Sequence, residues 1–329
     1  MSEKKQLNSR AKAILESARP GFQGIGIETH LLRNGAEVFH FDAQLTERFS
    51  ASAGILLSEI CLADLAKVEL LSDRDENPMT LKDFPFTVTV ETDQPLVACM
   101  ASQYAGWPLS VGKYFAMASG PARSVRGKEK VLDEYNLVEE SDSVVVVLET
   151  SELPDESVAE AIARECDVAP DRVQICVART SCLSGAMQIV ARSVETLMHK
   201  LHELGFDLTL IKKGIGSVPL PPLGQDDLQS LGWTNDSVLY GAEVVLTVDC
   251  EDGLIEDVGP RVPSSSSADF GTPFLEIFER FDRDFYKIDK MLFSPAKVAF
   301  ENVRTGNRFE FGGLRFDILD DSWKVPSDD

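Results

Sequence analysis

The segment from Ser143 to Gly205 reads SVVVVLETSELPDESVAEAIARECDVAPDRVQICVARTSCLSGAMQIVARSVETLMHKLHELG and decides the fold class. It begins with an apolar run of strand length, Val144 to Leu148, and Pro154-Asp155-Glu156 is a typical helix start. A second strand-like run, Arg172 to Ala178, is followed by helical spacing from Ser184 to Leu204. These lengths predict a βαβα unit with parallel strands.

The residues before this unit predict a mixture of helices and strands. Gln6 to Arg19 has helical spacing, and Gln94 to Tyr104 is a second expected helix. Strand-like runs, Gly24 to Leu32 and Ala36 to Asp42, flank Arg33-Asn34-Gly35, and an Asn-Gly pair is a strong hairpin signal. The pattern before the βαβα unit is therefore α+β.

The rest of the chain extends the same pattern. Ser237 to Cys250 is strand-like, and a stripe of phenylalanines follows at helical spacing, namely Phe274, Phe278, Phe281 and Phe285. Such a stripe is typical of core packing. We expect an α+β fold of two domains, residues 1–135 and 136–329, with the βαβα unit in the second. The boundary is approximate, and the domains can be discontinuous.

Composition excludes several classes of function. The 329 residues carry a net charge of −22, which makes nucleic acid an unsuitable partner. No apolar run reaches the roughly 20 residues that span a bilayer, and the polar start has no secretory signal. Six cysteines without a CxxC pair and four histidines indicate neither a disulfide framework nor a metal site. We expect a soluble cytoplasmic protein without a metal.

The helix from Ser184 to Leu204 has a polar face opposite its apolar stripe. Gln188, Arg192, Glu195 and His199 fall on that face. Arg192 and Glu195 are three residues apart, so the two side chains can form an ion pair. From periodicity alone, an exposed face with one ion pair is the simpler interpretation.

The other motifs in the sequence do not identify a function. A basic cluster follows a Gly-Pro turn, and its members are Arg123, Arg126, Lys128 and Lys130. It can bind an anion or form a solvated loop. The chain has no GxGxxG fingerprint in the required context, no phosphate-binding loop and no GxSxG elbow. Neither a nucleotide cofactor nor a serine nucleophile is indicated.

Several stretches resemble the methenyltetrahydromethanopterin cyclohydrolases. They are GILLSEICLADLAKVEL from Gly54, GKYFAMASGPAR from Gly112, LETSELPDESVAE from Leu148, VARSVETLMHKL from Val190, TNDSVLYG from Thr234 and FDRDFYKIDKMLFSPAKV from Phe281. Their order along nearly the whole chain makes the resemblance global. Ala118 stands where the family's loop has glycine, which bears on the geometry of that loop.

The resemblance implies a fold, a site and a reaction. It implies a pocket between two α+β domains and a catalytic Arg-x-x-Glu motif, which falls here on Arg192 and Glu195. It also implies a homotrimer, for which the phenylalanine stripe is a candidate interface. Further candidate substrate contacts are Tyr114, Ser119 and Arg123 in the Gly-Pro loop and Thr234, Asn235 and Asp236 before a strand, although ordinary loop and turn architecture explains each of them equally well.

The implied reaction is the reversible hydrolysis of the cyclic amidinium bridge of 5,10-methenyl-tetrahydromethanopterin to 5-formyl-tetrahydromethanopterin, in formaldehyde oxidation or methanogenesis. The bridging carbon is already electrophilic, so neither a metal nor another cofactor is expected. Glu195 would act as general base on water, and Arg192 would orient it. Two alternatives stay open: a cyclohydrolase acting on a folate-type carrier, and a non-catalytic pterin-binding protein.

Overall fold

The computed structural model describes residues 6–41 and 51–324, and the chain divides into two compact units. Unit 1 combines residues 1–67 with 97–188, and unit 2 combines 68–96 with 189–329. Both units are discontinuous in sequence, so the division differs from the single boundary expected after residue 135. Asp42, the expected end of a hairpin strand, lies outside the described residues.

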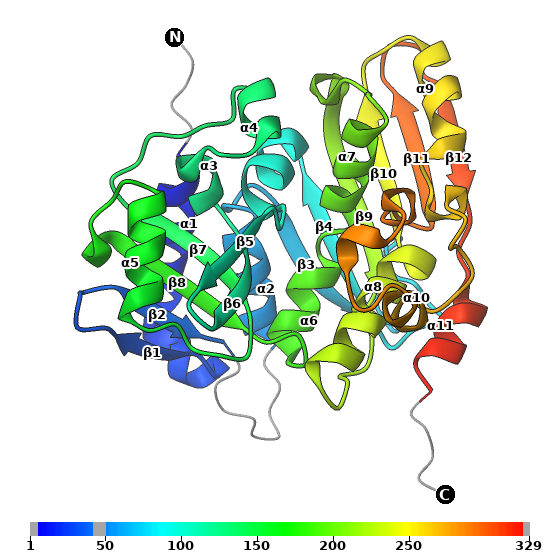
Figure 1. Ribbon diagram of the computed structural model, residues 1–329. Coiled ribbons are helices and arrows are strands. Elements are labelled where there is room, and N and C mark those ends of the chain that lie inside the picture. Colours follow the sequence, from blue (N-terminus) through cyan, green and yellow to red (C-terminus); the bar gives the residue numbers. More distant parts are fainter. Residues whose placement is uncertain (1–5, 42–50, 325–329) are drawn as a thin grey trace, which may run out of the picture. The chain divides into compact units, whose positions relative to one another are not determined.

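The α+β fold class is confirmed, and unit 1 is built on a six-stranded sheet in the order β1-β2-β8-β7-β6-β5 (Figure 1). Its strands are β1 (Glu28–Leu31), β2 (Glu37–His40), β5 (Trp107–Val111), β6 (Tyr114–Ser119), β7 (Val144–Glu149) and β8 (Val173–Ala178). β2, β8 and β7 run parallel, and the other pairs are antiparallel. The parallel pairing of β7 with β8 confirms the βαβ part of the predicted βαβα unit, which lies in unit 1 and not in the second domain as expected.

Helices cover both faces of this sheet. The helices that pack on it are α1 (Leu7–Ala18), α2 (Ala51–Cys61), α3 (Ala122–Arg126) and α5 (Glu156–Glu165). Unit 1 also contains α4 (Lys130–Glu134), most of α6 (Leu183–Val190) and the π-helix η2 (Leu96–Gln103), which begins as the chain returns to unit 1. Leu15 and Leu57 share a core with Val145, whereas Ile162 of α5 shares another with Val146. Because neighbouring strand residues face opposite ways, two covered faces require the continuous apolar run in β7.

The predicted hairpin forms around Asn34 and Gly35. β1 and β2 pair antiparallel, with Glu28 opposite His40 and Leu31 opposite Glu37. Gly35 has a φ of 87°, which favours glycine at this turn position. The turn thereby sets which side chains of the two strands lie side by side.

Unit 2 is built on a second six-stranded sheet, in the order β12-β11-β10-β9-β4-β3. Its strands are β3 (Lys67–Ser72), β4 (Phe86–Thr92), β9 (Ile211–Pro219), β10 (Glu243–Val248), β11 (Lys297–Asn302) and β12 (Arg308–Gly312). β10 and β11 are parallel, while β9 is antiparallel to both β4 and β10. Figure 1 shows α7 lying against β9 and β10.

The helices of unit 2 pack around an aromatic core. They are α7 (Ser193–Glu203), α8 (Asp227–Gly241), α9 (Asp252–Val258), α10 (Phe274–Arg280) and α11 (Phe316–Ser322). Phe274 and Phe278 of α10 are buried with Tyr240 of α8 and Leu319 of α11. The phenylalanine stripe is therefore mainly core, as its spacing predicts, and only Phe285 is exposed. Because its first two members are buried within the unit, the stripe is a poor candidate for a subunit interface.

Two predictions about elements were wrong. The helix expected from Ser184 to Leu204 is two helices, α6 and α7, because the backbone leaves helical geometry at Ala191 and Arg192. The strand expected from Ser237 begins instead as the last turn of α8, and β10 starts only at Glu243.

Seven short 3-10 segments complete the described elements: Arg19–Ile25, Pro170–Arg172, Leu208–Leu210, Gly259–Arg261, Ser264–Ser266, Phe285–Lys287 and Lys290–Leu292. Within residues 6–41 and 51–324, no helix is both long enough and apolar enough to cross a membrane.

Candidate active site

A polar cluster lies where β7 and β8 of unit 1 end. Glu149 is the last residue of β7, and its two carboxylate oxygens accept hydrogen bonds from Thr180 Oγ1 at 2.9 Å and Gln188 Nε2 at 3.3 Å. Gln188 lies in α6 and is buried. The carboxyl ends of parallel strands are where α/β sheets bind ligands. The cluster therefore marks a candidate binding edge, directly before the Arg-x-x-Glu motif in the chain.

Arg192 and Glu195 occupy the start of α7 in unit 2. Arg192 is the residue before the first helical turn, with φ −84° and ψ 7°, and Glu195 lies within that turn. The Arg192 carbonyl accepts hydrogen bonds from the backbone N–H of Thr196 at 2.7 Å and from its Oγ1 at 2.9 Å. A carboxylate is favoured in the first turn of a helix, where the N–H groups point outward.

Three residues of the predicted polar face, Gln188, Arg192 and Glu195, are buried, and His199 is half-buried. Arg192 is 8% exposed and Glu195 is 6% exposed. The simpler interpretation of an exposed face with one surface ion pair was therefore wrong. Burying charged groups costs free energy that apolar residues would not cost, so buried charges in a defined position are candidates for a functional site.

Two glycines of β9 allow the start of α7 to approach the sheet closely. A Cβ on Gly216 would lie 2.2 Å from Ser193 Oγ, and one on Gly214 would lie 2.6 Å from Val194 Cγ1. A larger residue at either glycine must displace the Ser193 hydroxyl or the Val194 side chain at the start of α7. The sequence GIGS within β9 thus determines where the backbone of Arg192 and Glu195 sits in unit 2.

Tyr114 and Ser119 lie on β6, and not in the Gly-Pro loop where the sequence placed them. Both are buried in unit 1. The Tyr114 hydroxyl is buried and has no hydrogen-bond partner among the described residues, and burial raises the pKa of this phenol. The Ser119 hydroxyl lies 3.3 Å from Cys61 Sγ. Their positions favour a role in packing over substrate contact.

Arg123 is fully buried, and all three nitrogens of its guanidinium group donate hydrogen bonds within unit 1. Its guanidinium donates to both carboxylate oxygens of Glu129, and to the carbonyls of Met100 at 3.2 Å and Ser102 at 3.1 Å. It also lies 4.9 Å from the ring centre of Tyr104. These contacts hold the end of η2, which favours loop architecture over substrate binding.

Two further cations of the basic cluster share one carboxylate. Arg126 Nε and Lys128 Nζ both contact Glu165, at 3.0 Å and 2.7 Å. Together with the Arg123–Glu129 pair, these contacts set two carboxylates against the four cations of the cluster, so about half of its positive charge is neutralised. The cluster is therefore a weak candidate for binding an anion.

Thr234, Asn235 and Asp236 lie inside α8, so the expectation that they precede a strand was wrong. Thr234 Oγ1 and Asn235 Nδ2 donate to carbonyls one turn earlier, at Ser230 and Leu231. Asp236 is fully buried and accepts hydrogen bonds from the Phe274 backbone N–H at 2.7 Å and from Ser322 Oγ at 2.5 Å. Burial raises the pKa of Asp236 to about 7. The carboxyl group thus ties α8 to α10 and α11.

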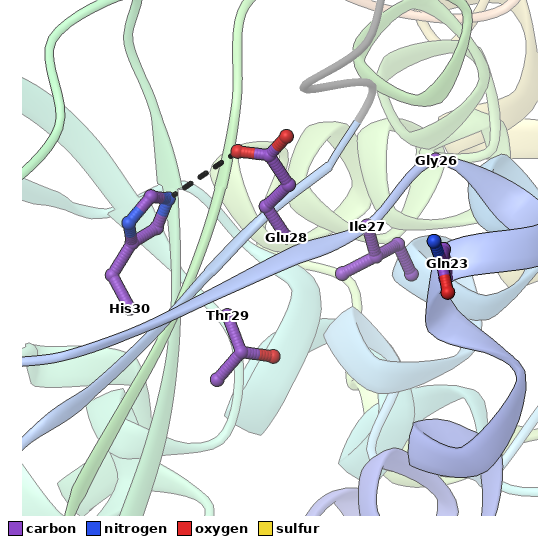
Figure 2. Close-up of a pocket in the computed structure, with 6 residues that line it drawn as sticks. All are labelled: Gln23, Gly26, Ile27, Glu28, Thr29 and His30. Carbon is purple, nitrogen blue, oxygen red and sulfur yellow. Dashed lines mark ion pairs between the residues drawn. The ribbon is translucent and has the colours of Figure 1, made fainter.

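A pocket of about 340 Å³ lies elsewhere in unit 1 (Figure 2). Its lining residues are Gln23, Gly26, Ile27, Glu28, Thr29 and His30. None of the predicted site residues lines it. Beside it, Glu28, His30 and His40 bring three potential metal-ligating atoms within 4.8 Å of one another. Residue spacing along the chain does not indicate this cluster, although a hairpin centred at Asn34 and Gly35 places Glu28 opposite His40.

The chain is similar to known proteins along nearly its whole length. Residues 6–323 match the family model described as Cyclohydrolase (MCH). A methenyltetrahydromethanopterin cyclohydrolase of Rhodopirellula baltica is 45% identical over 291 residues, covering 87% of this chain and 85% of the relative. The protein of that name from Methanococcoides burtonii is 39% identical over 323 residues, covering 97% and 98%. The one from Methylobacillus flagellatus is 38% identical, covering 96% and 93%.

Proposed function

Because this chain belongs to the methenyltetrahydromethanopterin cyclohydrolase family, we propose that its Arg192 and Glu195 carry the hydrolysis of a methenyl bridge. The chain is an enzyme of one-carbon metabolism that interconverts 5,10-methenyl-tetrahydromethanopterin and 5-formyl-tetrahydromethanopterin. The observation that carries the assignment of residues is the burial of both charged side chains at the start of α7.

The substrate needs little activation of its carbon. Its methenyl carbon lies between two nitrogens in an amidinium cation, so it is already electrophilic. What the protein has to supply is a positioned water molecule and a base. We therefore propose that the reaction uses the chain's own residues, without a metal or another cofactor at the reacting carbon.

Glu195 is the proposed general base. It takes a proton from water as the water oxygen bonds to the methenyl carbon, which gives a neutral tetrahedral intermediate. The protonated Glu195 then delivers that proton to N10 as the C–N10 bond breaks with its electron pair on N10. The hydroxyl of the intermediate loses its proton to solvent, which leaves the formyl group on N5. One proton is released overall, as the conversion of a cation and water to a neutral product requires.

Arg192 is the proposed positioning partner. A buried guanidinium beside this helix start can orient the carboxylate and hold the attacking water through its fixed fork of N–H donors. The negative Glu195 also complements the cationic substrate, and its burial strengthens that attraction because the local dielectric is low. Because one side chain sets the position of the other, replacing either should lower kcat more than it raises KM.

Two further properties belong to the same proposal. We propose a homotrimer from the family resemblance, and light scattering that gives a monomer would contradict it. We also propose a cytoplasmic location. The six cysteines are all free and buried, which suits a reducing compartment.

The direct test is the loss of near-ultraviolet absorbance when purified protein is added to methenyltetrahydromethanopterin. We expect strong acceleration over the spontaneous rate in the same buffer. No acceleration by folded protein would contradict catalysis and favour a pterin-binding role. Faster turnover of methenyltetrahydrofolate than of the methanopterin substrate would favour a folate-type carrier.

A further inference from the structure

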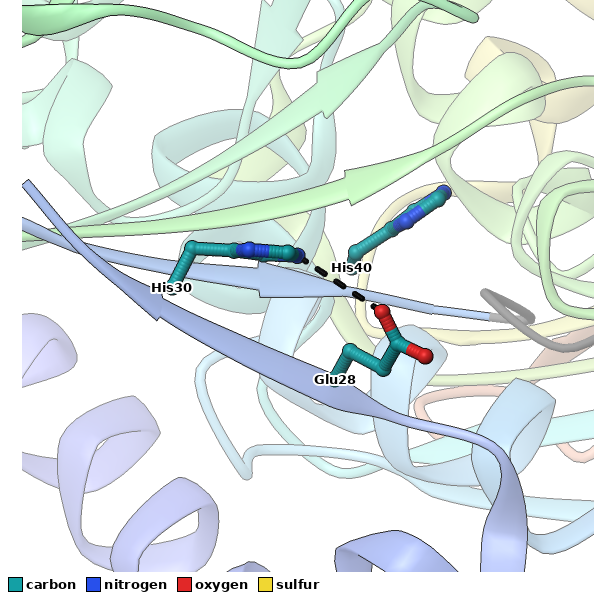
Figure 3. Close-up of side chains that lie close together, drawn as sticks. All are labelled: Glu28, His30 and His40. Atoms are coloured by element: carbon teal, nitrogen blue, oxygen red, sulfur yellow. Dashed lines mark ion pairs between the residues drawn. The ribbon is translucent and has the colours of Figure 1, made fainter.

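Three side chains with metal-ligating atoms lie on one face of the β1–β2 hairpin. Glu28 and His30 are two residues apart on β1 and so face the same way. His40 of β2 is directly opposite Glu28 in the antiparallel register. Figure 3 draws the three side chains together. The strand pairing fixes the three Cβ positions, so the cluster does not depend on a loop conformation.

The distances are close to those of a metal site. One ligand atom from each residue lies within 4.8 Å of the other two, and His30 Nε2 is 3.9 Å from Glu28 Oε2. Bonds of about 2.0 Å to a tetrahedral zinc ion place neighbouring ligands about 3.3 Å apart. Small side-chain rotations therefore suffice to bring the three atoms to an ion.

A second observation points to a ligand at this place. His30 Nε2 is buried, yet it makes no hydrogen bond with the described residues. A buried nitrogen without a partner costs free energy that a bound ion would offset. Glu28 and His30 also line the pocket of Figure 2, which leaves room for water or another ligand beside an ion.

We propose that Glu28, His30 and His40 bind a divalent transition-metal ion, with zinc the best match. Two imidazoles and one carboxylate form a donor set that suits zinc, whereas calcium and magnesium prefer oxygen ligands alone. Three protein ligands leave a fourth position for water. Spacing along the chain predicts no metal site, because it does not show which residues pair across the hairpin.

The ion's role follows from where the ligands lie. Among the strands that the structure describes, β1 is at the edge of its sheet and pairs with β2 alone. An ion held by both strands would cross-link this edge and stabilise unit 1. The proposal goes beyond the hydrolysis assigned to Arg192 and Glu195 and does not depend on it, so turnover should persist after the ion is removed.

The test is zinc binding to the full-length protein after dialysis against a chelator. Calorimetric titration with zinc chloride is compared for wild type, His30→Gln and His40→Gln. The control is His199→Gln, because His199 Nε2 also lies 3.9 Å from a carboxylate, that of Glu203, without a third ligand in the part of the chain that the structure describes. Circular dichroism checks that each variant is folded.

We expect wild type and His199→Gln to bind about one zinc ion and to gain thermal stability from it. Loss of a direct ligand should weaken binding at least about tenfold in each of the other variants. Cobalt should give a visible absorption band in wild type that His40→Gln lacks. Zinc binding that is absent in wild type, or equally tight in His40→Gln, would overturn the proposal. Neither result bears on turnover, which is measured separately.

Discussion

Gly216 of β9 lies so close to Ser193, the first residue of α7, that a Cβ at Gly216 would be 2.2 Å from Ser193 Oγ and 3.3 Å from Ser193 Cβ. The contact sets the start of α7, and the proposed catalytic pair flanks Ser193. Ser193 Oγ is buried and has no hydrogen-bond partner among the described residues. Its removal should therefore cost little.

We predict that Gly216→Ala lowers the free energy of unfolding by about 1–3 kcal/mol through overpacking. It should also lower kcat at least about tenfold, because small displacements of a catalytic group are costly. Removing the obstructing hydroxyl in Gly216→Ala/Ser193→Ala should restore much of both. Gly253→Ala is the control, since a Cβ there meets nothing within 4 Å. Full activity in Gly216→Ala would show that this contact does not position the pair.

The raised pKa of the buried Asp236 carboxyl group predicts that the stability of the protein depends on pH. Burial raises the pKa of its carboxyl group to about 7, and nearby Glu276 adds to the shift. The folded chain therefore binds more protons at this group than the unfolded chain between about pH 4 and pH 7. The stabilisation is complete below that window and is lost as the pH rises through 7.

Asp236→Asn should remove this dependence, because an amide can keep contacts with Phe274 and Ser322 without ionising. The melting temperature of wild type should fall more steeply than that of the variant between pH 4 and pH 7, where only the folded chain holds the extra proton. Thermal unfolding at matched ionic strength measures both slopes. Equal slopes would mean that Asp236 does not titrate in this range.

The variant Arg123→Lys tests whether Arg123 stabilises the fold of unit 1 or contacts the substrate. Lysine keeps the charge but not the planar fork that reaches Glu129 and two carbonyls at once. We predict a lower melting temperature with an unchanged KM for the folded enzyme. The exposed Arg164→Lys in α5 is the control and should change neither. A KM raised without loss of stability would instead make Arg123 a substrate contact.

Sequence patterns predicted the strands, helix starts and turns that are determined by residues close together in the chain. The predicted strand β7 and the predicted start of α5 are confirmed, and Asp155 caps α5 by accepting hydrogen bonds from the backbone N–H groups of Ser157 and Val158. The predicted hairpin at Gly35 is also confirmed. Each of these features depends on residues close in the sequence.

Tertiary packing decided the elements that were missed. The break between α6 and α7 at Arg192 is not marked by a glycine or proline. It lies where the start of α7 packs against Gly214 and Gly216 of β9. The β-branched and aromatic residues near the end of α8 suggested a strand, yet its contacts with α10 and α11 keep Asp236 and Tyr240 helical. Such contacts join residues far apart in sequence, and one sequence does not display them.

The most direct test of the account is the turnover of Glu195→Gln, which keeps the shape of the side chain and removes the base. We predict a fall in kcat of about 10²–10⁴-fold with unchanged circular dichroism and melting temperature. Glu256→Gln, an exposed substitution of the same kind in α9, should keep wild-type kcat. Wild-type turnover by folded Glu195→Gln would contradict the central claim that Glu195 activates the water.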